Sequence, residues 1–335
     1  MEKAKVDFRS FTIAGSATYL PVESIDAEAL DGLTGKPLGS TAKRFGVRKR
    51  HRANREETSS FMGANAARNA LGEAGWDPRS LDAIIGACGV MEQPIPGTSV
   101  LIQNRLGLGD SGIACFDVNA TCLSFLQALD RALAGFALGE WRRVLIVSAD
   151  IASAALDFSD PEASVLFGDG AAAFALQSEG PHRRLAHSFR TYGEGAHACR
   201  LDAGGTRLRP SDDLEAFLQA TKFKMAGKDV FRLTSRRFPG FLADLLASAA
   251  LSVEEIDLVV PHQASAAALE HLKRSIPDGH AKTVDIFASV GNQIATSLPF
   301  ALHTARAEGR LRARQHTLLI GSAAGISLGG AIIRW

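Results

Sequence analysis

The chain has 335 residues, of which 46% are apolar and 22% are charged, and its formal net charge is +1. This balance argues against a nucleic-acid-binding surface and a disordered tail, while the length allows two domains with large cores. Residues 1–7 lack the apolar stretch of a signal peptide, and no apolar run approaches the roughly 18 residues that span a membrane, so we expect a cytoplasmic protein without membrane contact.

The first half of the chain predicts a strand, a helix and a second strand, with a cysteine at the first junction. Residues 116–118 form a short apolar segment, residues 123–136 are apolar on almost every face of a helix, and residues 144–147 form another apolar strand. Cys122 therefore lies at the start of a buried helix, where unpaired backbone N–H groups favour the thiolate and lower the thiol pKa from roughly 8.5. Taken alone, Cys122 is explained equally well as a small buried hydrophobe.

The segment 192–223 is the least regular part of the sequence, because it is rich in glycine and mixed in charge and shows little periodicity. In an enzyme, a loop of this length is often a lid or a pocket wall. A solvated excursion explains its charged residues equally well.

Two polar side chains follow strands in the second half. An apolar strand broken by Pro261 delivers His262, and a strand and turn deliver Asn292 just before a helix. Open α/β sheets place ligand sites in the loops beyond the C-terminal ends of their strands. Together with Cys122, these residues form a candidate nucleophile, acid/base and polarising group. Asn292 is also a common turn residue beside a glycine such as Gly291.

The two halves resemble each other in the type and order of their segments. The corresponding pairs are 81–86 with 256–261, 116–118 with 284–286, 123–136 with 295–307, and 144–147 with 317–320. Such strand–helix–strand units require right-handed parallel crossovers, and continuous apolar strands indicate sheets covered on both faces. We therefore predict two halves of similar architecture, residues 1–178 with the cysteine and residues 179–335 with His262 and Asn292.

Several motifs, taken in order and spacing, resemble the β-ketoacyl-ACP synthase III family of the thiolase superfamily. They are GVRKRH (46–51), NATC (119–122), FGDG (167–170), MAG (225–227), VPHQA (260–264), GN (291–292) and GSAAGI (321–326). The resemblance covers nearly the whole chain. It implies the thiolase-like five-layer α/β/α/β/α fold, built from two similar halves.

The resemblance implies a decarboxylating Claisen condensation, in which Cys122 takes the acyl group of acyl-CoA or acyl-ACP before malonyl-ACP binds. Loss of carbon dioxide leaves an enolate, whose oxygen His262 and Asn292 stabilise through hydrogen bonds. Backbone N–H groups of Cys122 and Ala324 form the oxyanion hole, and the product is a 3-oxoacyl thioester. No metal or other cofactor is expected, in keeping with four cysteines that lack CxxC spacing.

The resemblance also implies substrate-binding residues. Arg44 would contact a phosphate of CoA, and Leu201 would lie near the acyl tail. The family forms homodimers through the N-terminal halves, so Ile95 would cross the interface and line the partner's acyl pocket.

Docking of acyl carrier protein is assigned by the same resemblance to three basic residues, Arg232, Lys273 and Arg274. They would face the acidic surface of the carrier. Lys273 and Arg274 are adjacent on a predicted helix, and an ordinary solvated face explains them equally well.

The sequence departs from the family pattern where CoA would bind. Ser40 stands where members that prime with acetyl-CoA have a tryptophan, and Pro161 stands where they have an arginine. The clamp on the CoA base is therefore missing, and the glycine run near the C-terminus is replaced by Ser-Ala-Ala-Gly at 322–325. These changes argue against acetyl-CoA priming and favour a longer acyl donor, an ACP-bound donor or a role in secondary metabolism.

Two other functions remain open at this point. One is an acyltransferase on the same scaffold that moves an acyl group to a hydroxyl or amine in secondary metabolism. The other is a non-catalytic subunit that offers a binding surface. The complete set of Cys122, His262 and Asn292 argues against the second, because an inactive subunit has no chemical need for all three.

Overall fold

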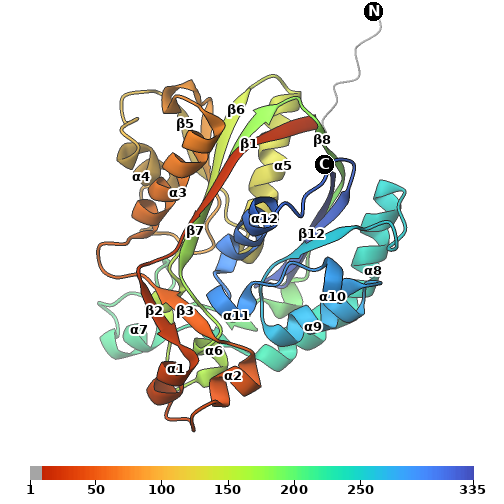
Figure 1. Cartoon of the computed structure of the whole chain (residues 1–335). Coiled ribbons are helices and arrows are strands. Elements are labelled where there is room, and N and C mark those ends of the chain that lie inside the picture. The colour runs from red at the N-terminus through yellow and green to blue at the C-terminus, as the bar shows by residue number, and fades with distance from the viewer. Residues whose placement is uncertain (1–9) are drawn as a thin grey trace, which may run out of the picture.

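The computed structural model describes residues 10–335; residues 1–9, which include the segment without a signal-peptide pattern, lie outside the described residues. Figure 1 shows the arrangement of the helices and strands. The strands are β1 (Ser10–Tyr19), β2 (Glu23–Asp26), β3 (Lys49–Arg52), β4 (Ala83–Gly86), β5 (Ala114–Asp117), β6 (Arg143–Asp150), β7 (Gly170–Ser178), β8 (His182–Thr191), β9 (Cys199–Arg200), β10 (Lys224–Met225), β11 (Leu258–Pro261), β12 (His316–Ala323) and β13 (Ser327–Arg334).

Helices alternate with these strands along the chain. The α-helices are α1 (Ala27–Thr34), α2 (Ser40–Phe45), α3 (Ser59–Ala74), α4 (Thr98–Arg105), α5 (Ser124–Ala137), α6 (Pro161–Ser164), α7 (Leu214–Ala220), α8 (Gly227–Ala249), α9 (Ala266–Arg274), α10 (Gly279–Lys282), α11 (Phe287–Val290) and α12 (Ser297–Ala307). Short 3-10 turns are η1 (Pro78–Ser80), η2 (Thr121–Leu123), η3 (Ala152–Ala155), η4 (Gly193–Gly195) and η5 (Ile294–Thr296). No helix within residues 10–335 combines the length and apolar character that a membrane span requires.

Each half of the main nine-stranded sheet has the same strand order. The first half runs β5-β4-β6-β7-β1, and the second runs β11-β12-β13-β8 with an isolated parallel bridge between Val259 and Thr283 beyond β11. β4 is parallel to β5 and β6, and β11 is parallel to β12, as the predicted crossovers require. The halves join where β1 pairs with β8. The division at residues 178 and 179, in the turn between β7 and β8, remains our proposal.

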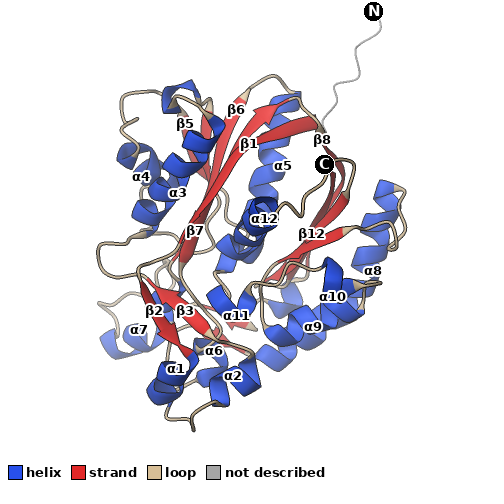
Figure 2. Ribbon diagram, in the orientation of Figure 1, coloured by secondary structure: helices blue, strands red, loops and turns tan. Residues whose placement is uncertain are grey.

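Helices form three layers around the two halves of the sheet (Figure 2). α3 and α4 cover the outer face of the first half, α8 and α10 pack on the second half, and α5 and α12 lie between the halves. Three separate apolar cores occupy the spaces between these layers. The predicted five-layer α/β/α/β/α fold is therefore confirmed.

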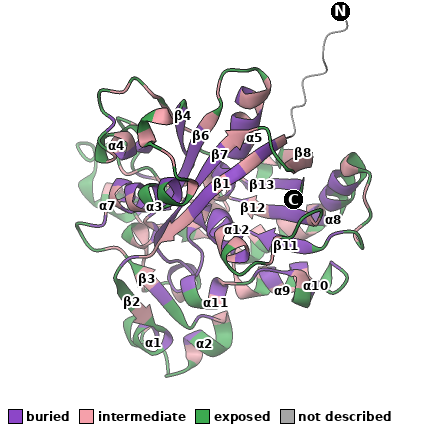
Figure 3. Cartoon of the chain, turned by 45° about the horizontal axis from the view of Figure 1, so that its top comes forward, coloured by how far each residue is buried: buried purple, intermediate pink, exposed green. Residues whose placement is uncertain are grey.

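Burial follows these layers (Figure 3). The strands β4, β6, β7, β11, β12 and β13 and the helix α12 are largely buried, whereas β8 is mostly of intermediate burial and half of the residues of α2 are exposed. α3 packs closely on the sheet because the facing residue of β1, Gly15, has no side chain. A Cβ atom on Gly15 would come within 2.1 Å of the carbonyl oxygen of Ala70 in α3. The Thr58 side chain accepts the N–H of Phe61 and caps the start of this helix.

Most predicted segments of the two halves correspond to elements of the structure, but the strand predicted at 284–286 is wrong. Only Thr283 bridges to β11 there. The Asp285 carboxylate accepts the N–H of Phe287, and the chain turns into α11 instead of continuing along the sheet. The irregular segment 192–223 contains η4, β9 and α7, and its first residue, Tyr192, exchanges two backbone hydrogen bonds with Ile326.

Candidate active site

Cys122 lies in η2, between β5 and the buried helix α5. The turn is held by local hydrogen bonds: the Asn119 side chain accepts the N–H of Thr121, and the Ser124 hydroxyl accepts the N–H of Ala120. Thr121 has φ of 51°, in the left-handed region that residues other than glycine rarely adopt. The turn thus places the thiol at the N-terminal end of α5, as predicted.

The pKa of Cys122 differs from the expectation. Burial, with smaller contributions from the nearby groups Cys199 and Asp150, raises the pKa of this thiol to about 12. Hydrogen bonds from the backbone N–H groups of Ala324 and Cys122 lower it, but less than burial raises it. The prediction of a lowered pKa, made from the helix alone, is therefore wrong for the free enzyme. The two N–H groups that act on the sulfur are the pair predicted to form the oxyanion hole.

His262 follows β11 and is buried next to the nucleophile's turn. Its backbone N–H donates to the Ile320 carbonyl at 2.9 Å. A Cβ atom on Gly321 would lie 2.6 Å from Cβ of His262 and 3.0 Å from Cδ2 of Leu123, so only glycine permits β12 to hold these two residues so close. Burial lowers the pKa of His262 to about 4. The ring is therefore neutral and carries one N–H that can donate to a ligand.

Asn292 is fixed on both its backbone and its side chain. Its N–H donates to the Leu166 carbonyl at 2.9 Å, and its carbonyl accepts the N–H of Gly168 at 3.1 Å. The side-chain Oδ1 accepts the N–H of Ile294 at 2.9 Å, and Nδ2 donates to the Ala264 carbonyl at 3.3 Å. The contact between Oδ1 and the N–H of Ile294 is the hydrogen bond expected of a turn residue. Because Nδ2 carries two hydrogens, one remains for a substrate oxygen.

The elements that carry these three residues meet at one place. η2 packs against both η5 and the end of β12. The loop after β11 links the other two residues, because Ala264 donates its N–H to the His262 carbonyl and accepts from Asn292 through its own carbonyl. Cys122, His262 and Asn292 are therefore brought together from distant parts of the chain.

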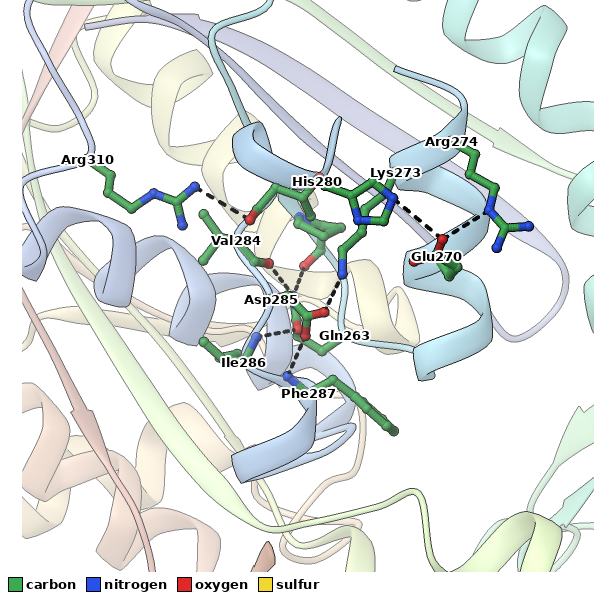
Figure 4. Close-up of polar contacts among 12 residues, drawn as sticks. Gln263, Glu270, Lys273, Arg274, His280, Val284, Asp285, Ile286, Phe287 and Arg310 are labelled. Carbon is green, nitrogen blue, oxygen red and sulfur yellow. Dashed lines mark hydrogen bonds and ion pairs between the residues drawn. The ribbon is translucent and has the colours of Figure 1, made fainter. Parts of the chain in front are cut away.

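Gln263 connects the loop that bears His262 to the segment that leads to Asn292 (Figure 4). This buried amide donates to the carbonyls of Pro261 and Val284 and accepts the N–H of Ile286. Each of its polar atoms is thus used to hold two chain segments at a fixed separation. The sequence predicted a catalytic role for the neighbouring His262, whereas it assigned no role to Gln263 beyond its place in the motif at 260–264.

Asp150 is a buried carboxylate that sequence reasoning missed. Its Oδ1 accepts the N–H groups of Gly89 and Val90 at 2.8 Å, and its Oδ2 accepts the N–H and hydroxyl of Thr296. Burial raises the pKa of Asp150 to about 7. It ties a loop of the first half to η5 of the second, close enough to Cys122 to affect its pKa. In the sequence, the position of this aspartate at the end of the apolar strand 143–150 was the feature that could have indicated its role.

Arg50 was also missed, although it lies in one of the motifs. This buried guanidinium donates to the carbonyls of Val165 and Phe287 and lies 4.8 Å from the centre of the Phe287 ring. It has no acidic partner among residues 10–335, and desolvation lowers its pKa to about 9. A Cβ atom on Gly291 would collide with it. Arg50 therefore supports the two segments that flank Asn292.

The predicted substrate-binding residues fall at different places. Arg44, at the end of α2, is not free, because its guanidinium pairs with Glu162 of α6 at 2.5 Å. Leu201 follows β9 and is partly exposed; Cys199, two residues before it, is near enough to raise the pKa of Cys122. Ile95 is 85% exposed in the loop before α4. Its predicted contact with a partner's pocket stays a prediction.

The three basic residues predicted to dock acyl carrier protein each have a carboxylate partner within the chain. The pairs are Arg232 with Asp229 at 3.0 Å, Lys273 with Asp285 at 2.7 Å, and Arg274 with Glu270 at 3.0 Å. Figure 4 shows the last two on and beside α9. Their docking role stays a prediction, and the positive charge they offer a partner is reduced by these contacts.

Comparison with known proteins agrees with the sequence motifs. Residues 116–193 match the family described as 3-oxoacyl-[acyl-carrier-protein (ACP)] synthase III, and residues 246–335 match its C-terminal region. The chain is 33% identical to the β-ketoacyl-[acyl-carrier-protein] synthase III of Bordetella petrii over 96% of this chain and 97% of that protein.

Solved structures give the same result. The 3-oxoacyl-[acyl-carrier-protein] synthase III of Aquifex aeolicus is 29% identical, with a TM-score of 0.86 over 98% of this chain and all of that one. OleA of Xanthomonas campestris is 20% identical, with a TM-score of 0.85 over 98% of this chain and 99% of that one, and it shares the fold.

Proposed function

The chain belongs to the 3-oxoacyl-[acyl-carrier-protein] synthase III family of acyl-transferring condensing enzymes, and we propose that it works through an acyl group held on Cys122. The convergence of Cys122, His262 and Asn292 on one site carries this proposal. Fatty acid biosynthesis is the setting of the family, and its substrates are thioesters of CoA and of acyl carrier protein.

In the first step, the Cys122 sulfur attacks the carbonyl carbon of the acyl thioester. The bond between that carbon and the carrier sulfur breaks, and the carrier leaves as a thiol with the Cys122 proton. The backbone N–H groups of Cys122 and Ala324 already act on the sulfur. They can therefore donate to the oxyanion that forms on the acyl carbon. Burial disfavours the free thiolate of Cys122. The thiol therefore loses its proton only when the acyl thioester is bound.

In the second step, a malonyl thioester loses carbon dioxide and becomes an enolate. A neutral His262 N–H and the remaining Asn292 Nδ2–H donate to the enolate oxygen, which preorganised donors stabilise as its charge develops. The carbanion then attacks the acyl carbon on Cys122. The C–S bond breaks, Cys122 is released as a thiolate that takes up a proton from solvent, and a 3-oxoacyl thioester leaves.

We further propose that the acyl donor is longer than acetyl, or is bound to acyl carrier protein. The supporting observation is a cavity of about 390 Å³ beside α2, whose lining includes Ser40 and Pro161 in place of the family's two-sided clamp. We also propose that the protein forms a homodimer. Ile95, a large apolar side chain left exposed in the single chain, is the residue we expect to reach the partner's pocket.

Mass spectrometry of the intact protein tests the reaction. Incubation with a series of acyl-CoAs should add one acyl group per chain, and subsequent malonyl-ACP should remove it and yield a 3-oxoacyl-ACP. Transfer of the acyl group to an alcohol or amine, without loss of carbon dioxide, would instead establish the simpler acyltransferase.

A further inference from the structure

A basic cavity opens between α2 and α6. Three of its lining side chains are cationic, and none is acidic; the lining residues are Lys36, Ser40, Thr41, Lys43, Arg44, Phe45 and Pro161. Among residues 10–335, Lys36 and Lys43 form no ion pair. A cavity of this charge suits an anionic group such as a phosphate.

Arg44 is the cation in this cavity that already has a partner. Its Nη2 lies 2.5 Å from Oε1 of Glu162, and both side chains are well exposed, at 61% and 58%. Glu162 lies in the first turn of α6, directly after Pro161, and the Asp160 side chain accepts its backbone N–H. The carboxylate is thus held beside the cavity without being part of its wall.

We propose that Glu162 is a specificity-determining residue, whose carboxylate competes with the phosphates of a thioester donor for the guanidinium of Arg44. The inference rests on the proposed function, because it needs a thioester donor at this cavity. An exposed ion pair is weak, so a phosphate group that binds the guanidinium through two oxygens can displace the carboxylate. Glu162 therefore weakens the binding of phosphate-rich donors such as acyl-CoA. Donors without phosphate are not affected.

The test compares two thioesters of the same medium-chain acyl group, one of CoA and one of N-acetylcysteamine, which carries no phosphate. Initial rates of turnover, measured with malonyl-ACP present to remove the acyl group from Cys122, give kcat and KM for each. Glu162→Gln should lower KM for the acyl-CoA by about two- to fivefold, with the change in KM and not in kcat, because one exposed ion pair is removed. KM for the N-acetylcysteamine thioester should not change.

A matched control is Glu140→Gln. Glu140 also forms an exposed pair with an arginine, Arg131, at 2.6 Å, but at the far end of α5 from Cys122. This variant should leave both KM values as they are. In the double variant Arg44→Gln and Glu162→Gln, the gain seen with Glu162→Gln alone should disappear, because the two substitutions act on one contact.

A rise in KM for acyl-CoA in Glu162→Gln would overturn the inference, since it would mean that Glu162 positions Arg44 for the substrate. An equal fall in KM for both thioesters would also overturn it. Failure of the proposed function would look different, because neither thioester would then acylate Cys122 in any of these proteins.

Discussion

Replacement of Asn292 by aspartate separates the two roles that the sequence leaves open for this residue. Aspartate keeps an oxygen that can accept the N–H of Ile294, so the turn contact seen at 2.9 Å is retained. It has no N–H, so the hydrogen bond to the Ala264 carbonyl and the donor available to the enolate oxygen are both lost. Asparagine-to-aspartate exchange is also close to isosteric, which limits changes in packing.

The expected loss is large and confined to one step. Removal of a single oxyanion donor typically costs about 10²–10³ in rate, or about 2.7–4 kcal/mol of transition-state stabilisation. Release of carbon dioxide from labelled malonyl-ACP, measured with enzyme already acylated on Cys122, should fall by at least the lower figure. Acylation of Cys122 itself should change much less, because its oxyanion is assigned to backbone N–H groups.

Asn292→Ala, which removes the turn contact as well, serves as the reference. If the aspartate variant condensed at the wild-type rate while the alanine variant failed, Asn292 would be a turn residue and the donor assignment would be wrong. If both variants lost acylation and decarboxylation equally, the effect would be structural.

Cys122→Ala should abolish labelling by acyl-CoA in peptide mass spectrometry, and label retained in that variant would refute the mechanism. Substitution of Cys88 or Cys115 by alanine should leave the label in place. Because burial lowers the pKa of His262 to about 4, the contribution of His262 to decarboxylation by acylated enzyme should be constant above roughly pH 6 and decline only as pH falls towards that pKa. A step near pH 7 is expected only from Asp150, whose pKa burial raises to about 7, so a step that persists in Asp150→Asn would contradict the assignment of a neutral histidine. Finally, kcat/KM should rise from acetyl-CoA towards medium-chain acyl-CoAs, by up to ~0.8 kcal/mol for each buried methylene, and a maximum at acetyl-CoA would show that the missing clamp is without effect.

The apolar pattern predicted covered sheets and a buried helix, and the family resemblance implied the five layers. The segment 123–136 is apolar on nearly every face, and such a helix has to be covered on all sides; α5 accordingly lies between the halves of the sheet. The segment 284–286 also has a strand-like pattern, but the polar contacts of Asp285 determine its conformation. Asp285 accepts the N–H of Phe287 and pairs with Lys273 of α9, which no local pattern reveals.

The sequence predicted which three residues the structure brings close together, Cys122, His262 and Asn292, and was less successful with their electrostatics. The helix end at Cys122 was visible in the sequence, and it argued for a lowered pKa. Desolvation reverses that direction, because the partly buried Cys122 packs against a core formed by residues from both halves. The roles of Asp150 and Arg50 were not predicted either, because they also depend on tertiary structure. Their hydrogen-bond partners lie far away in the chain, and only the tertiary structure shows that they hold the segments around Asn292 and η5.

The internal repeat continues into the active site at the level of single hydrogen bonds. The turns before α5 and α12 each have an asparagine whose side chain accepts the N–H two residues on, a residue with φ near 50°, and a serine whose hydroxyl accepts a backbone N–H four residues before it. The corresponding pairs are Asn119 and Asn292, Thr121 and Ile294, Cys122 and Ala295, and Ser124 and Ser297.

This repeated turn explains why nucleophile and donor meet. Because η2 and η5 occupy the same topological position in the two halves, and the halves pack face to face around α5 and α12, the two turns lie against each other. Each half then uses a different position of the same turn. The first places a thiol at Cys122, where the second has Ala295, and in the proposed reaction the second presents the asparagine side chain of Asn292 to the substrate. In the proposed reaction the chemistry is thus divided between two copies of one structural unit, and neither half contains all three of Cys122, His262 and Asn292.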